Sequence, residues 1–182
     1  MNSLSLEIKA RCSDPVRIRK ILLAYGASFK GLDLQTDTYF RIPSGRLKLR
    51  EGNIENALIH YKRVNQKGSK RCDSTLAKCE NGRALKKTLA AALGVLTVVI
   101  KKREIYFLRN VKFHIDRVKH LGNFVEIEAF GRKGGSAVKL RKQCKFYKKL
   151  LGISSRDLLA DSYSDQLLRL ETTDRRQKTK NK

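Results

Sequence analysis

The sequence predicts one α+β domain, built as an antiparallel β-barrel with helices packed against its outside. First, apolar and charged residues alternate along several segments, a pattern that is typical of strands. Second, several of these segments are joined by only two to five residues, and strands joined so closely are antiparallel. Third, other segments place apolar residues at helical spacing. A chain of 182 residues, 41% of them hydrophobic, can bury the core of one such domain.

The expected elements follow in order along the chain. A strand is predicted over 6–10, and Ser13-Asp14-Pro15 is typical of a helix N-cap followed by proline, so a helix begins there and ends at Gly26. Asn81 and Ser136 begin two further helices, which end at Gly94 and Gly152. The remaining strands are predicted over 29–40, 46–50, 58–64, 96–108, 111–118 and 124–130. A short helical segment over 155–170 precedes a basic tail, and we expect a domain over 1–171 and a disordered tail over 172–182.

The net charge of +24 predicts a polyanionic partner. Nucleic acid, an acidic membrane surface and a phosphorylated small molecule all fit this charge. The basic helix over 136–151, together with the tail, is a candidate surface for nucleic acid. The longest nearly apolar run, 89–100, is too short for a membrane span, which needs about 20 apolar residues. With no signal peptide apparent and four cysteines at spacings that suit neither zinc nor a disulfide framework, we expect a cytoplasmic or nuclear protein.

Charged residues share one face of several strands, and apolar residues occupy the other face. The groups that share a face are Arg46, Lys48 and Arg50; Lys101 and Arg103; His114 and Asp116; and Glu126 and Glu128. Either these faces point to water, as in many antiparallel sheets, or helices cover the apolar faces and the charges line the barrel interior. The three helices with apolar stripes favour the second arrangement. Such an interior suits a polyphosphate bridged by a divalent metal ion.

Several motifs then occur in a specific order. They are Glu7-Ile8-Lys9, Thr36 to Phe40, Gly45 to Arg50, Tyr61-Lys62-Arg63, Lys101-Lys102-Arg103, Asp116-Arg117-Val118, Phe124 to Glu128 and Asp161-Ser162-Tyr163. In this order and spacing the chain resembles the CYTH family, the triphosphate tunnel metalloenzymes, over roughly residues 5 to 168. That family joins class IV adenylate cyclases, thiamine triphosphatases and inorganic triphosphatases. The run from 116 to 128 is most similar to the class IV cyclase-like branch.

The resemblance implies a role for each matching residue. It implies that Lys9, Lys48, Arg50, Lys62, Lys101 and Arg103 bind phosphate oxygens, with Arg63 as a further candidate of opposite strand parity to Lys62. It implies that Glu7, Asp116, Glu126 and Glu128 bind Mg²⁺ or Mn²⁺. It also implies that Glu7, Lys9 and Arg103 take part in catalysis. The three histidines form no catalytic triad and are interpreted as core or solvated residues.

One position departs from the family pattern. Ser5 stands where the family's ExExK signature has its first glutamate. Hydrolysis of an inorganic, organic or nucleoside triphosphate is the function that the resemblance implies. Two alternatives stay open: cyclisation of ATP to cAMP, and non-catalytic binding of polyphosphate, nucleotide or RNA.

Overall fold

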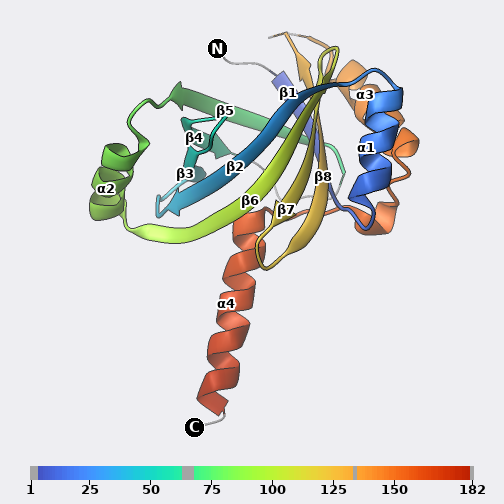
Figure 1. Ribbon diagram of the computed structural model, residues 1–182. Helices are drawn as coiled ribbons and strands as arrows, with labels where there is room; N and C mark the ends of the chain where they lie inside the picture. Colours follow the sequence, from blue (N-terminus) through green and yellow to red (C-terminus); the bar gives the residue numbers. More distant parts are fainter. Residues whose placement is uncertain (1–3, 63–67, 133–134, 181–182) are drawn as a thin grey trace.

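The computed structural model describes residues 4–62, 68–132 and 135–180. Its centre is a closed barrel of eight antiparallel strands in the order β1-β5-β4-β3-β2-β6-β7-β8 (Figure 1). The strands are β1 Leu4–Arg11, β2 Ser28–Phe40, β3 Arg46–Glu51, β4 Ala57–Lys62, β5 Lys70–Lys78, β6 Val95–Leu108, β7 Val111–Val118 and β8 Gly122–Gly131. The helices are α1 Pro15–Ala24, α2 Gly82–Leu93, α3 Ala137–Leu150 and α4 Tyr163–Lys180, with a short 3-10 turn at Ser155–Asp157. The predicted α+β barrel is therefore confirmed.

Strand β1 closes the barrel because it pairs with β8 along its length and with β5 at its start. Its register places Glu7 opposite Glu128 and Lys9 opposite Glu126. On the other edge, Ser5 lies opposite Cys72. Since opposed residues of antiparallel strands point to the same face, these pairs decide which side chains meet inside the barrel.

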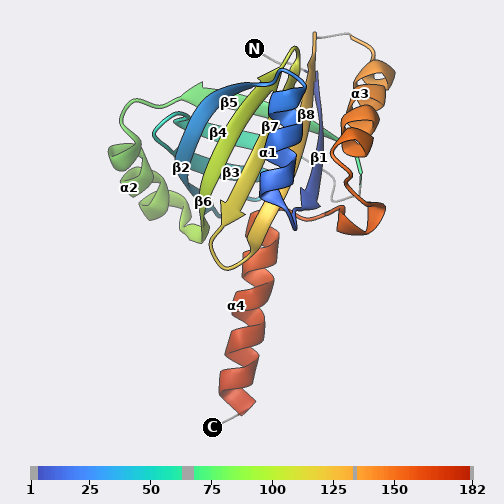
Figure 2. The same ribbon diagram turned by 45° about the vertical axis from the view of Figure 1, so that its right-hand side comes forward.

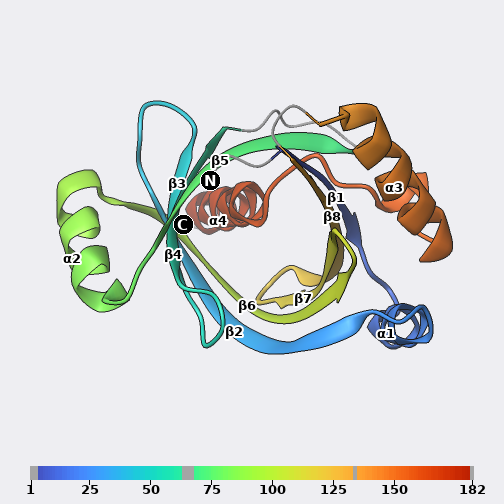
Figure 3. The same cartoon turned by 90° about the horizontal axis from the view of Figure 1, so that it is seen from above.

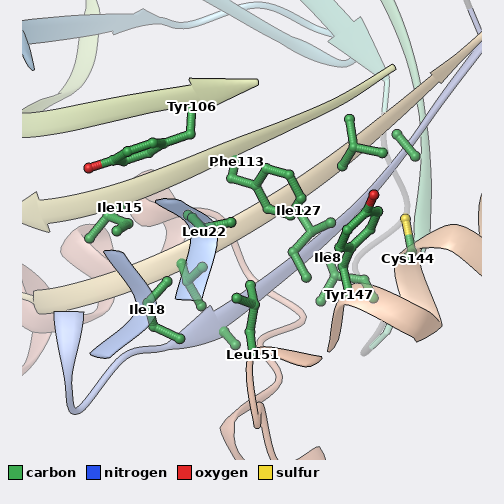
Figure 4. Packing of buried hydrophobic residues seen from close by; sticks show 14 of the residues in the cluster. Ile8, Ile18, Leu22, Tyr106, Phe113, Ile115, Ile127, Cys144, Tyr147 and Leu151 are labelled. Atoms are coloured by element: carbon green, nitrogen blue, oxygen red, sulfur yellow. The ribbon is translucent and has the colours of Figure 1, made fainter. Parts of the chain in front are cut away.

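Helices α1 and α3 cover the outer face of β1, β7 and β8 (Figure 2). The core between them contains Ile8, Phe113 and Ile127 from the strands and Leu22 and Tyr147 from the helices, as Figure 4 shows. Asp14 caps α1 by accepting a hydrogen bond from the backbone N–H of Arg17, and Ser136 caps α3 through Lys139. The apolar faces of β1, β7 and β8 therefore point outward to these helices, which leaves the charged faces of these strands inside.

Helix α4 closes one end of the barrel. In the view from above, α4 lies end-on within the outline of the strands (Figure 3). Its first residues, Tyr163 and Leu167, pack in a second apolar cluster with Tyr39, Val99 and Phe124 from the inner face. Arg46 of β3 also donates to Asp165 of α4 at 3.2 and 2.9 Å. The charged part of the inner face therefore lies above an apolar floor.

Two segments differ from the sequence expectation. Strand β5 was not predicted, because neither face of Lys70–Lys78 is consistently apolar. Helix α4 is longer than the expected segment over 155–170 and crosses the predicted boundary at residue 171. No glycine or proline interrupts its sequence, so nothing local ends it there. None of the described helices is both long and apolar enough to cross a membrane.

Candidate functional site in the barrel

The inner face gathers charged side chains from several strands. On β1, Leu6, Ile8 and Ala10 belong to the outer core, so the alternating residues Ser5, Glu7 and Lys9 face inward. The same alternation places Lys48 and Arg50 of β3 and Lys101 and Arg103 of β6 inside. Lys9, Arg50, Lys101 and Arg103 are all buried. The barrel thus brings together five of the six predicted phosphate ligands.

Asp37 of β2 binds three of these cations at once. Its carboxylate accepts hydrogen bonds from Arg50 at 2.8 and 3.1 Å, from Lys48 at 3.0 Å and from Lys101 at 2.6 Å. Burial opposes ionisation of Asp37, but the cations outweigh it and hold the pKa of this carboxyl well below its usual range. Arg50 also pairs with Glu55, so the three cations of the cluster bind two carboxylates and still exceed them in charge. Burial lowers the pKa of Lys101 to about 7, and the neighbouring cations act in the same direction. The Asp37 carboxylate opposes this shift only in part.

A second network surrounds Arg103. Its guanidinium donates to Asp116 at 2.7 and 2.5 Å and to Glu126 at 2.8 Å. Glu126 also pairs with Lys9, at 2.6 Å between Nζ and Oε1. Burial disfavours the ionised form of Glu126, but Lys9 and Arg103 outweigh it and hold the pKa of this carboxyl well below its usual range. Asp116 and Glu126, two of the predicted metal ligands, therefore already bind Arg103 and Lys9.

Tyr163 and His114 complete this network. The Tyr163 hydroxyl donates to Asp116 at 2.8 Å, and the Lys9 ammonium lies 3.3 Å from the centre of the Tyr163 ring. This distance is typical of a cation–π contact. His114 is buried, not solvated. Its Nδ1 lies 3.0 Å from Glu126, and its Nε2 has no hydrogen-bond partner among the residues that the structure describes. Burial, and next the positive charge of Arg103, lower the pKa of His114 to about 4.

Glu7 and Glu128 place two carboxylates side by side on the inner face. Their Cα atoms are paired in the β1–β8 register. Burial, and then the Glu7 carboxylate, raise the pKa of Glu128 to about 7, while Lys112 and a hydrogen bond from Ser5 act to lower it. Two adjacent, half-buried carboxylates are a donor set that fits Mg²⁺ or Mn²⁺, which commonly takes one or two carboxylates plus substrate oxygens and water. Among the described residues no group of three or more metal-ligating side chains is arranged around one point, and the assignment of Asp116 and Glu126 as metal ligands stays a prediction.

A carboxylate from a loop also reaches the inner-face cations. Glu55, between β3 and β4, accepts from Arg50 at 2.8 Å and pairs with Lys112 of β7. The buried Asp33 holds the loop by accepting hydrogen bonds from the backbone N–H groups of Ile54 at 2.9 Å and Glu55 at 3.0 Å. Glu55 therefore links cations from β3 and β7, two strands that are not neighbours in the barrel.

Lys62 does not join the other predicted ligands. It follows the buried Tyr61 on β4 and is exposed, so it lies on the outer face. The motif match selected Lys62, whereas strand alternation excludes it. Arg63 lies outside the described residues.

Five residues of the site were given no functional role from the sequence: Asp37, Glu55, Lys112, His114 and Tyr163. The polar alternation of Asp33, Gln35 and Asp37 along β2 was a usable signal for one of them. A cavity of about 250 Å³ lies beside these networks, between the end of β2, the start of β3 and α4, and includes Tyr39, Arg46 and Asp165 in its lining.

Comparisons with known proteins agree with this geometry. The barrel superposes on the PH1012 protein of Pyrococcus horikoshii OT3 with a TM-score of 0.79 and 24% identity, covering 88% of this chain and 98% of that one. HpAC1 of Hippeastrum, described with a dominant triphosphatase activity, gives a TM-score of 0.59 and 13% identity over 87% of this chain and 91% of that one. The RNA triphosphatase Pct1 of S. pombe gives a TM-score of 0.51 and 12% identity, covering 86% of this chain and 85% of that one.

These identities are low, so the superpositions show a shared fold and no more. None of the curated proteins matches this chain in sequence. The CYTH domain family matches it over residues 4–163, which is most of its length. The chain therefore belongs to the CYTH domain family.

Proposed function

We propose that this chain binds a triphosphate among the inner-face cations and hydrolyses it with Mg²⁺ or Mn²⁺. The observation that carries the proposal is the cluster of Lys48, Arg50 and Lys101 around the carboxylate of Asp37. This cluster has more positive charge than Asp37 neutralises, and phosphate oxygens are strong acceptors for such donors. Membership of the CYTH domain family supports the choice of a triphosphate.

The divalent metal follows from the charge inside the barrel. Glu7 and Glu128 would hold it, because their paired positions in the β1–β8 register place two carboxylates side by side on the inner face, a donor set that suits such an ion. A triphosphate carries about four negative charges near neutral pH, and placing it beside two carboxylates without a counter-ion would be strongly unfavourable. When bound, the metal would neutralise charge on the phosphate oxygens.

Hydrolysis transfers the terminal phosphoryl group to water and breaks the bond from its phosphorus to the bridging oxygen. Negative charge develops on that oxygen as diphosphate leaves, and fixed cations stabilise such a transition state. We assign this role to Arg103 and Lys9. Asp116 accepts from both Nε and Nη2 of Arg103, which fixes the plane of the guanidinium. Asp116 and Glu126 are therefore positioning residues.

The test measures binding and turnover separately. Binding of tripolyphosphate is measured by calorimetry, and release of phosphate is followed with tripolyphosphate, ATP and thiamine triphosphate, with Mg²⁺, with Mn²⁺ and with a chelator. Arg50→Ala should weaken tripolyphosphate binding by about 1.5–3 kcal/mol, the magnitude of a lost charge-assisted hydrogen bond. Lys62→Ala is the matched control, because it removes one cation from the outer face.

The outcomes distinguish the three activities. Metal-dependent phosphate release that falls in Arg50→Ala supports the proposal. Formation of cAMP from ATP would replace hydrolysis by cyclisation. Tight tripolyphosphate binding without turnover under any metal condition would make this chain a triphosphate-binding protein that lacks the catalytic step. Equal binding by wild type and Arg50→Ala would refute the placement of the triphosphate.

A further inference from the structure

The positive charge of this chain is concentrated outside the barrel. On the described inner face, acidic and basic side chains are close to balanced: the bases are Lys9, Arg46, Lys48, Arg50, Lys101, Arg103 and Lys112, and the acids are Glu7, Asp33, Asp37, Glu55, Asp116, Glu126 and Glu128. The net charge of +24 therefore cannot come from the triphosphate site. A soluble domain does not need so large a charge of one sign, and self-repulsion opposes folding.

Helix α3 presents much of this outer charge on one surface. Its sequence, AVKLRKQCKFYKKL, contains six Lys or Arg and no acidic residue. Leu140, Cys144 and Tyr147 are buried against the barrel, so the opposite side carries Lys142, Lys145 and Lys149. Lys139 and Arg141 are exposed as well. About 15 Å of helix separates the first and last of these lysines, at a rise of about 1.5 Å per residue.

The neighbouring helix α1 extends the surface. The Arg17 guanidinium lies against Gly152, just beyond α3, so that a Cβ atom at Gly152 would stand 2.5 Å from it. Figures 2 and 3 show α1 and α3 on the same side of the barrel. Arg17 and Lys20 are exposed, and the sequence of α1, PVRIRKILLA, has no acidic residue.

One aromatic side chain stands among these lysines. The side chain of Phe146 is 56% exposed on α3 and contacts Tyr147 edge-on, with 5.1 Å between the ring centres. An exposed aromatic ring beside a row of cations is the combination by which proteins bind single strands, with phosphates on the lysines and a base stacked on the ring. An interfacial membrane helix needs a free apolar face, whereas the apolar face of α3 is already buried.

We propose that the α1–α3 surface, formed by Arg17, Lys20, Lys139, Lys142, Lys145, Phe146 and Lys149, binds single-stranded nucleic acid. This surface lies on the outside of the barrel, away from the inner-face cations, and its function does not depend on hydrolysis.

The test is the affinity for a fluorescent single-stranded RNA of about 16 nucleotides with a 5′-hydroxyl. Because this RNA has no triphosphate, the inner-face site does not contribute to the signal, and failure of one proposal leaves the other untouched. With about four phosphate contacts, affinity measured by anisotropy should fall about fiftyfold between 50 and 200 mM salt.

Paired charge reversals locate the surface. Lys145→Glu with Lys149→Glu should reduce the affinity about tenfold at physiological salt and flatten its salt dependence, because two phosphate contacts are lost. Arg83→Glu with Lys87→Glu is the matched control: both residues are exposed, they have the same spacing, and α2 lies on the opposite side of the barrel (Figure 3). Equal loss of affinity in both double variants would show that only net charge matters and would overturn the proposal.

Substitution of the exposed apolar residues separates nucleic acid from membrane. Phe146→Ala should weaken RNA binding about tenfold through lost stacking, whereas Val138→Ala, at a position that is 61% exposed, should leave it unchanged. Binding to phosphatidylserine vesicles that depends on Val138 as well as Phe146, with no measurable affinity for RNA, would assign the surface to a membrane instead and refute the proposal.

Discussion

Replacing Asp37 by asparagine should make the protein less stable and yet improve its binding of tripolyphosphate. The substitution keeps the shape of the side chain but removes the anion shared by Lys48, Arg50 and Lys101. Removing one partner of a buried ion pair costs about 3–5 kcal/mol. Lys101, whose pKa is about 7, can lose its proton and relieve part of the repulsion, so we expect the lower value. For a chain of this size, about 3 kcal/mol lowers the melting temperature by roughly 6–12 °C.

The same change removes the carboxylate that competes with phosphate for the three cations. Tripolyphosphate should therefore raise the melting temperature of Asp37→Asn by more than that of wild type, as measured by circular dichroism at matched ligand concentrations. Asp161→Asn is the control, because Asp161 pairs with Arg169, whose side chain is 61% exposed, and should cost less than about 1 kcal/mol. If Asp37→Asn melts like wild type, the cations do not depend on this carboxylate. If tripolyphosphate raises the melting temperatures of wild type and Asp37→Asn by the same amount, phosphate does not bind at this cluster.

Two further predictions concern Lys101 and Ser5. Burial lowers the pKa of Lys101 to about 7, so between about pH 7 and 10 the unfolded chain binds more protons than the folded one, and the contribution of Lys101 to the free energy of unfolding rises with pH. Urea unfolding of the wild type should show a free energy of unfolding that is higher at pH 9 than at pH 7 by on the order of 2 kcal/mol, and Lys101→Met should lack this rise. Equal pH dependence in the wild type and Lys101→Met would contradict the prediction. Ser5→Glu would add a third carboxylate beside Glu7 and Glu128, so it should lower the melting temperature in chelator, raise the stabilisation by Mn²⁺, and increase turnover about tenfold. Equal Mn²⁺ stabilisation of both proteins would place the metal elsewhere.

Most of the barrel was predictable because its strands alternate in a consistent way. Arg46–Glu51 and Gly122–Gly131 each have one apolar and one charged face, and this pattern determines both the element and its orientation. Strand β5 lacks the signal, since Cys72, Ser74 and Leu76 share one face with Lys70 and Lys78. It is a strand because β1 and β4 offer free edges on both sides, and that information is in the tertiary structure alone.

The sequence predicts which cations of the site face inward, but it does not predict which carboxylates they pair with. Parity along one strand places Arg50 and Lys101 inside, but only the register between β2 and its neighbours brings Asp37 between them. Similarly, α4 lies 47 residues beyond Asp116 in sequence, so the hydrogen bond from Tyr163 to Asp116 has no local signal. For Lys62 the local pattern was informative: its position in the alternation of β4 places it on the outer face, whereas the motif match had selected it as a phosphate ligand.

Two halves of the inner face suit ligands of opposite charge, and this separation explains how substrate and metal would bind together. Around Asp37, three cations share one anion, which favours the oxygens of a triphosphate. Around Glu128, a second carboxylate lies directly opposite, which favours a divalent cation. A triphosphate alone would satisfy the first half and repel the second, and a metal ion alone would satisfy only the second. Since each ligand reduces the electrostatic cost of the other, their binding is expected to be mutually reinforcing, as linkage between two sites requires.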